Sequence, residues 1–173
     1  MRRADELTKQ ELIDLLVKSW MAHDGMWFYN TYLDSGIEKA NKINKAAIQS
    51  LASFEIGWAK KAFGVTKERF ENFEELKEFF TSARELFIPP FMNASATFPR
   101  ENVIHWEFLP KKCFAYRGIS RIGIIEQYEC GVVYRLQCWF ESLGLDFTVT
   151  PEISRCAMID NDICGGDFEF FFS

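Results

Sequence analysis

The sequence contains no block of basic residues and no long apolar run. Its 173 residues carry a formal net charge of −5, whereas a protein that binds nucleic acid needs a concentrated cationic surface. A membrane-spanning helix needs roughly 20 consecutive apolar residues, and no stretch approaches that length. We therefore expect neither nucleic acid nor a membrane as a partner. No apolar segment follows Arg2 and Arg3, which argues against a signal peptide and favours a cytoplasmic location.

The sequence also lacks a CxxC motif. The cysteines are odd in number, which in a cytoplasmic protein indicates thiols rather than a disulfide framework; they are Cys113, Cys130, Cys138, Cys156 and Cys164. Their spacing matches neither a zinc ribbon nor a zinc finger, and no cofactor is evident. Two interpretations remain open. Cys113, Cys130 and His105 could assemble a divalent metal site in space, or the cysteines could be small buried hydrophobes.

Aromatic residues are abundant, with 18 phenylalanines and a total aromatic content of 16%. Aromatic rings bury large areas, so they predict a bulky core, and such a core can frame a pocket for a small organic ligand. No repeat, low-complexity tract or linker interrupts the chain. A single domain over residues 1–173 is therefore expected, with a helical part at 1–88 and a second part at 89–173.

The first part has the spacing of three helices. A capping box at Thr8 and Glu11 begins a helix over residues 8–33, and Ser35-Gly36 ends it. Two apolar stripes at helical spacing predict the buried faces of this helix and of a second, antiparallel one over residues 37–63. They are Leu12, Leu16, Trp20, His23, Trp27 and Ile48, Leu51, Glu55, Trp58, Ala62. The third helix begins after residue 66, or restarts at 72–75, and ends at Pro89-Pro90.

The spacing changes after residue 89. Alternation over residues 93–98 and 103–109 predicts a β-hairpin, with Ile104, Trp106 and Phe108 on one face. Helical spacing returns over residues 127–143. Residues 145–149 and 168–172 are expected to be strands, and residues 155–158 a third. The predicted fold class is α+β: three N-terminal helices followed by an antiparallel β-sheet with one long helix packed across it.

Two polar residues lie on the predicted apolar stripes. His23, beside Asp24, could serve as a base or a metal ligand, or it could be a core histidine bonded to a backbone carbonyl. Glu55 would need a partner if it is buried, because burying a lone carboxylate costs several kcal/mol. His23 on the antiparallel helix is one candidate partner, and exposure of Glu55 at the edge of the stripe is the alternative.

Three residues of the helix predicted over 127–143 could carry chemistry. Cys130 precedes Gly131 near a helix start, where amide dipoles lower a thiol pKa, so it is the candidate nucleophile. Arg135 and Trp139 are one turn apart on one helical face. Arg135 could bind a carboxylate ligand, or it could lie over the core as a surface arginine. We expect the opposite wall of this pocket at the turn from His23 to Trp27.

Several of these segments resemble a known family. The segments His23-Asp24-Gly25-Met26-Trp27-Phe28, Cys113-Phe114-Ala115-Tyr116 and Tyr128-Glu129-Cys130-Gly131, continuing through Arg135, Trp139 and Leu143-Gly144, carry the resemblance. They are similar to uncharacterised prokaryotic cytosolic proteins related to the L-2-amino-thiazoline-4-carboxylate hydrolases. The tail, Gly165-Gly166-Asp167, resembles these hydrolases and the 4-vinyl-reductase-type ligand-binding domains, although Cys164 here precedes the glycines.

The sequence leaves two functions open, and the resemblance implies the first of them. One is hydrolysis of a C–N bond in a small cyclic substrate bearing a carboxylate. Arg135 would hold that carboxylate, and Cys130, or a water activated by His23 or a metal, would attack, with Glu55 paired to His23. The alternative is a non-catalytic small-molecule-binding or sensing domain, whose pocket would include Trp27, Trp139, Asp24 and Tyr128. A homodimer is a further expectation.

Overall fold

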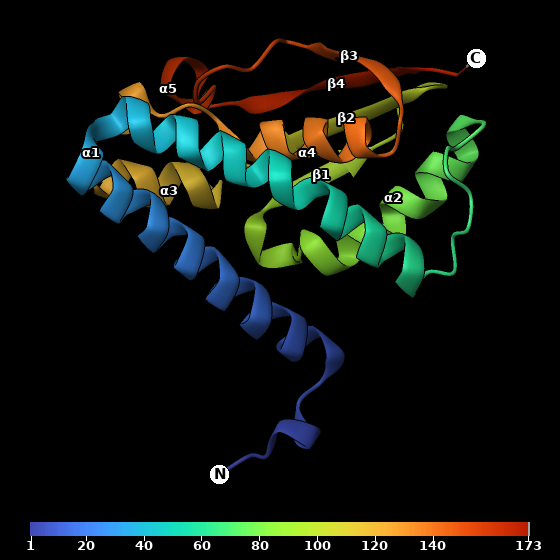
Figure 1. Cartoon of the computed structure of the whole chain (residues 1–173), viewed down its shortest axis with the longest axis horizontal. Coiled ribbons are helices and arrows are strands. Elements are labelled where there is room, and N and C mark those ends of the chain that lie inside the picture. Colours follow the sequence, from blue (N-terminus) through green and yellow to red (C-terminus); the bar gives the residue numbers. More distant parts are fainter. Residues whose placement is uncertain (173) are drawn as a thin grey trace.

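A four-stranded antiparallel sheet lies along one side of the molecule, with helices over one of its faces (Figure 1). The computed structural model describes residues 1–172. The strand order is β1-β2-β4-β3. The strands are β1 (Ala94–Thr97), β2 (Val103–Phe108), β3 (Asp146–Thr150) and β4 (Cys164–Phe171). The predicted α+β class and the predicted β-hairpin over β1 and β2 are confirmed.

The sheet is buried on one face only. Along β4, Phe168 and Phe170 are buried, while Asp167 and Glu169 point to the other face, as expected for a strand with period two. Helix α4 (Gly131–Ser142) covers the buried face, because the ring of Phe140 lies 5.0 Å from that of Phe168 and 4.8 Å from that of Phe170. The predicted helix across the sheet is therefore present, although it begins at Gly131 rather than at residue 127.

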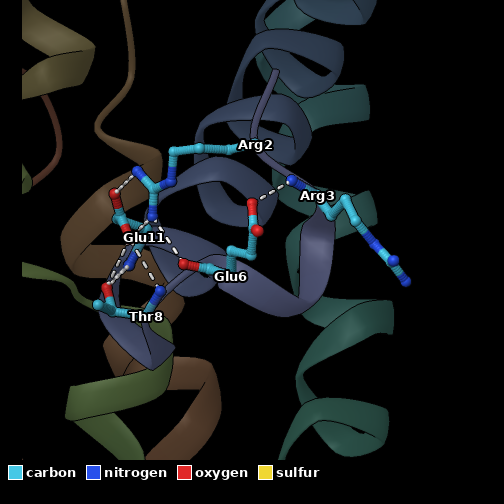
Figure 2. Close-up of polar contacts among 5 residues, drawn as sticks. All are labelled: Arg2, Arg3, Glu6, Thr8 and Glu11. Atoms are coloured by element: carbon cyan, nitrogen blue, oxygen red, sulfur yellow. Dashed lines mark hydrogen bonds and ion pairs between the residues drawn. The ribbon is translucent and has the colours of Figure 1, made fainter.

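Helix α1 (Lys9–Ala62) is bent at Gly36, which has φ 79° and ψ 172°. Only glycine adopts this conformation without strain. The bend separates an amino-terminal arm, residues 9–35, from a second half, residues 37–62, as the Ser35-Gly36 pair predicts. The capping box at the start is also confirmed, because the Glu11 N–H donates to Thr8 Oγ1 over 3.2 Å (Figure 2).

The buried faces of α1 differ from the predicted stripes. The arm buries only Phe28; Leu16 is 68% exposed and Trp27 is 66% exposed. The arm runs out from the body at its amino end (Figure 1), so its stripe has no protein layer to pack against. The second half packs on α4 through Glu55 and the neighbouring residues Ala52, Ile56 and Ala59, whereas Trp58 is exposed.

Helix α2 (Phe73–Phe87) begins at the predicted restart, because the Glu75 N–H donates to Asn72 Oδ1 over 3.0 Å. Its predicted buried face is confirmed at four positions and only partly buried at the last; these are Phe73, Leu76, Phe80, Ala83 and Phe87. A short 3-10 turn, Pro90–Met92, follows it. No helix in the described part of the chain is both long and apolar enough to cross a membrane.

Two segments of the second part differ from the prediction. Helix α3 (Phe114–Arg121) was not predicted. The strand expected at residues 155–158 was wrong: Arg155 forms only an isolated bridge with Glu129, and helix α5 (Met158–Asn161) follows. Both segments are short, so neither has enough turns to show a clear period.

Candidate functional site

A cavity of about 760 Å³ opens between the two halves of α1. Its other walls come from α2, α3, α4 and the first two strands. The lining is mainly apolar and aromatic. Its aromatic residues are Trp20, Trp27, Phe28, Tyr29, Phe80, Phe87, Trp106, Phe108, Phe114, Tyr128 and Trp139. Volumes of about 300–1,000 Å³ with such linings are typical of sites for small organic ligands.

A buried ion pair lies behind one wall of this cavity. Glu55 on the second half of α1 is only 5% exposed. Arg135 of α4 binds it twice: Nε donates to Glu55 Oε2 over 3.1 Å, and Nη2 donates to Oε1. Trp139 Nε1 also donates to Glu55 Oε2, over 2.7 Å. The carboxylate is thus satisfied by charge and by hydrogen bonds, which is what burial of a carboxylate requires.

The guanidinium of Arg135 also lies against indole rings. Its Cζ is 4.2 Å from the ring centroid of Trp20 on the arm and 5.0 Å from that of Trp139. An arginine over a tryptophan face gains electrostatic and dispersion energy. Arg135 therefore joins three elements, namely the arm, the second half of α1, and α4, at the edge of the cavity.

The amino end of α4 is fixed closely to α1. The buried side chain of Asn41 donates to the carbonyl of Gln127 over 2.8 Å and accepts from the N–H of Glu129 over 3.2 Å. Gly131 permits the close approach, because a Cβ there would lie 2.8 Å from Asn44 Nδ2. This junction sets the position of Arg135, one turn further along α4.

Five of the sequence-predicted site residues line the cavity. They are Asp24, Trp27, Tyr128, Arg135 and Trp139. Asp24 is the only acidic residue among the described lining residues, and burial raises the pKa of its carboxyl, while the charges of Arg135 and His23 act in the opposite direction. Burial also raises the pKa of the Tyr128 hydroxyl. The wall expected at the turn from His23 to Trp27 is therefore present at Asp24 and Trp27, but His23 does not line the cavity.

The three predicted catalytic residues are not among the lining residues. His23 is exposed on the arm, where its Nε2 accepts from Trp27 Nε1 over 3.1 Å. Glu55 lies behind Arg135 and Trp139. The buried carboxylate does have a partner, as expected, but the partner is Arg135 rather than His23.

Cys130 is not the activated thiol that its place at a helix start predicted. It occupies the N-cap of α4, yet burial raises its pKa, although the N–H groups of Val133 and Val132 act in the opposite direction. It borders a small void together with Cys113, Cys156 and Cys164, and this void adjoins the large cavity, because Tyr128 and Val132 line both. Desolvation outweighs the helix dipole here because the thiol is almost fully buried.

The candidate metal ligands do not come together. Cys113 and Cys130 both border the small void, but His105 points to the open face of the sheet, where its Nδ1 lies 2.6 Å from Asp167 Oδ1. Residues 1–172 contain no group of three or more histidine, cysteine, aspartate or glutamate side chains arranged to hold a metal.

Sequence reasoning missed two cationic residues in the lining, Lys18 and Arg84. Arg84 follows Phe80 by four residues, so it lies on the edge of the apolar face of α2. A charged residue at such a position could have been recognised from the sequence, as Glu55 was on the apolar stripe of its own helix. Lys18 had no comparable signal, because the arm has charged residues all around it.

Comparison with known proteins gives one match, to a family model. Residues 5–81 match the model of a family of unknown function, DUF6125. The matched segment covers α1, whose two halves both line the cavity, and the first half of α2. No curated protein matches the chain. No solved structure matches it either.

Proposed function

We propose that this protein binds an apolar small molecule in the cavity between the two halves of α1, without catalysing a reaction. The cavity itself carries the proposal. Its volume of about 760 Å³ and its aromatic lining fit a small organic ligand. Unlike a core, where packing leaves few voids larger than a water molecule, this space is filled by no side chain among the described residues.

The hydrolase implied by the sequence resemblance has weaker support. A nucleophile must be both activated and accessible. Cys130 has a raised pKa and lies outside the lining, and His23 does not meet it. Turnover of L-2-amino-thiazoline-4-carboxylate by the wild type, lost in Cys130→Ala, would overturn the binding proposal in favour of the hydrolase.

Two glycines allow a matched test of the cavity. Gly118 on α3 lines the cavity, whereas Gly57 on α1 does not. A Cβ added at either position meets no atom within 4 Å. A phenylalanine side chain at 118 would therefore start in open space at the cavity wall, where we expect its ring to take up cavity volume, whereas one at 57 would start outside the lining.

The experiment is a fluorescence titration with the neutral apolar dye Nile red. We expect saturable binding at one site per chain to the wild type and to Gly57→Phe. Gly118→Phe should weaken binding about tenfold or more, because the new ring takes the volume of the ligand. Absence of saturable binding to the folded wild type, or equal binding by the two variants, would refute the proposal.

A further inference from the structure

The cavity has a cationic end and an apolar end. Its charged lining residues are Lys18, Arg84, Arg135 and Asp24, so cations outnumber acids. The two arginines are connected through a ring contact: Phe87, one turn after Arg84, lies 5.4 Å from Trp139, one turn after Arg135. The cationic end is therefore the end where α2 and α4 meet.

The opposite end, next to the bend of α1, is apolar. There α3 lies beside the bend (Figure 1). Ile119 and Ile122 of α3 pack against the cluster of Phe28, Ala40 and Tyr128, and all five residues line the cavity. A ligand spanning the cavity would meet arginines at one end and hydrocarbon at the other.

Both arginines have donors left for a ligand. Glu55 occupies Nε and Nη2 of Arg135, and Nη1 donates to no described residue. Trp20 and Trp139 lie against the guanidinium, so a further acceptor would approach its edge. Arg84 donates from Nη1 to the carbonyl of Ala96 over 3.1 Å and pairs with no described carboxylate. An unpaired arginine beside an apolar cavity favours an anionic acceptor.

The remaining two charges do not reverse this preference. Lys18 lies 4.7 Å from the centroid of the Phe91 ring and 3.8 Å from Asp14, so its ammonium is only loosely paired. Asp24 is the one acid in the lining, and burial disfavours its ionised form. Glu55 already balances the charge of Arg135, which leaves Arg84 and Lys18 against Asp24, so the net charge of the described lining favours an anion.

We propose that the ligand is an anionic amphiphile, a carboxylate on an extended apolar chain. Its head would bind Arg84 and the free edge of Arg135, and its tail would run toward α3. This inference rests on the proposed function and adds the chemical class of the ligand. It makes Arg84 and Arg135 the residues that select the head group.

Three probes with the same twelve-carbon tail separate head from tail: dodecanoate, 1-dodecanol and dodecylammonium. Each would be titrated below its micelle concentration, as competitor of Nile red and by quenching of tryptophan fluorescence. We expect dodecanoate to bind about tenfold or more tightly than 1-dodecanol, because a charge-assisted hydrogen bond contributes that much. Dodecylammonium should bind most weakly.

Variants of Arg84 locate the head group. Arg84→Met should reduce the affinity for dodecanoate to near that for 1-dodecanol, and Arg84→Lys should retain part of the preference because it keeps the charge. Lys42→Met removes an exposed cation of α1 outside the lining and should change nothing. Thermal unfolding of each variant would confirm that it folds.

The outcomes separate this inference from the proposed function. Equal binding of dodecanoate and 1-dodecanol, or tighter binding of dodecylammonium, would overturn the anionic ligand while leaving the apolar site intact. Unchanged dodecanoate affinity in a folded Arg84→Met variant would also overturn it. Failure of the wild type to bind Nile red or any dodecyl probe would instead refute the binding function itself.

Discussion

At the scale of single residues, the buried pair of Glu55 and Arg135 has the strictest requirement for compensating contacts. The Arg135 side chain is 15% exposed and that of Glu55 is 6% exposed. Two charges in such a place are tolerated only if they compensate each other and their remaining polar atoms are bonded. Trp139 Nε1 supplies the additional bond to Glu55. Removing either charge alone would leave the other buried without a partner.

Glu55→Leu should lower the free energy of unfolding by about 3–5 kcal/mol, because the Arg135 charge would remain buried and unpaired. The double variant with Arg135→Met should recover most of this loss. Glu74→Gln, which breaks the exposed pair with Lys77, is the control and should cost less than about 1 kcal/mol. Urea unfolding measures all three, and a double variant less stable than the single one would contradict the assignment.

The reactivity of the five cysteines can test whether their thiols are buried hydrophobes. All five are buried and free. Burial raises the pKa of Cys113 to about 11 and raises that of Cys130 as well, so their reactive thiolate forms are scarce at pH 8. In the native protein at pH 8 we expect no thiol to react rapidly with Ellman's reagent, and full reaction after unfolding. A single fast thiol that is lost in Cys130→Ala would restore the nucleophile hypothesis.

Helices with a capping signal were predictable at the scale of elements. Thr8 with Glu11, Asn72 before α2, and Pro89 after it each act within one turn of the backbone. Such contacts involve neighbours in sequence, so the sequence alone contains the necessary information. Gly36 was predictable for the same reason, because a bend with positive φ needs glycine.

Elements without such signals were missed. Helix α3 follows Cys113, which provides no side-chain cap. The segment at residues 155–158 was expected to be a strand, but it pairs with Glu129 at Arg155 only. Tertiary packing determines the secondary structure of these segments, and a short window of sequence does not contain the information on that packing.

The first turn of α1 gives a pH-dependent prediction. A hydrogen bond from Arg2, followed by the Thr8 N–H, lowers the pKa of Glu11 from 4.5 to about 2 (Figure 2). Because the folded pKa lies below the unfolded one, this contribution to helix stability is present above pH 4.5 and is lost as the pH falls toward about 2. A carboxyl NMR titration should show a low midpoint for Glu11.

The matched variant for this titration is Arg2→Gln. It removes the largest cause of the shift, so the midpoint should rise toward 4.5. Because the pair is exposed, 1 M salt should act in the same direction by screening. A Glu11 midpoint that does not respond to the variant would show that the Thr8 contacts alone set it.

At the scale of the whole molecule, the site depends on contacts that the sequence does not reveal. Glu55 and Arg135 are 80 residues apart in sequence. The unusual position of Glu55 on an apolar stripe showed that it needed a partner, and Arg135 was a candidate for a ligand site. Nothing in the spacing connected the two, because the crossing of α1 and α4 depends on Asn41 and Gly131 at their junction.

The arm is the least anchored part of the fold. Over residues 9–27 it buries no side chain, and it contacts the body through Trp20 against Arg135 and Lys18 over Phe91. The second half of α1, by contrast, is held by a buried ion pair and close packing on α4.

The homodimer expected from the sequence stays a prediction, as do the cytoplasmic location and the single domain.

The difference in burial between the two halves of α1 predicts which half opens locally more often. Backbone amides of residues 9–27 should exchange with solvent faster than those of residues 40–59, because local opening follows burial. Dodecanoate should slow exchange in the arm, since Trp20, Met21 and Asp24 would then contact ligand in the cavity. Hydrogen exchange with mass spectrometry measures both effects, with Gly118→Phe as the control that blocks the cavity. Equal protection of the two halves, or slowing that persists in Gly118→Phe, would show that the arm does not close the ligand site.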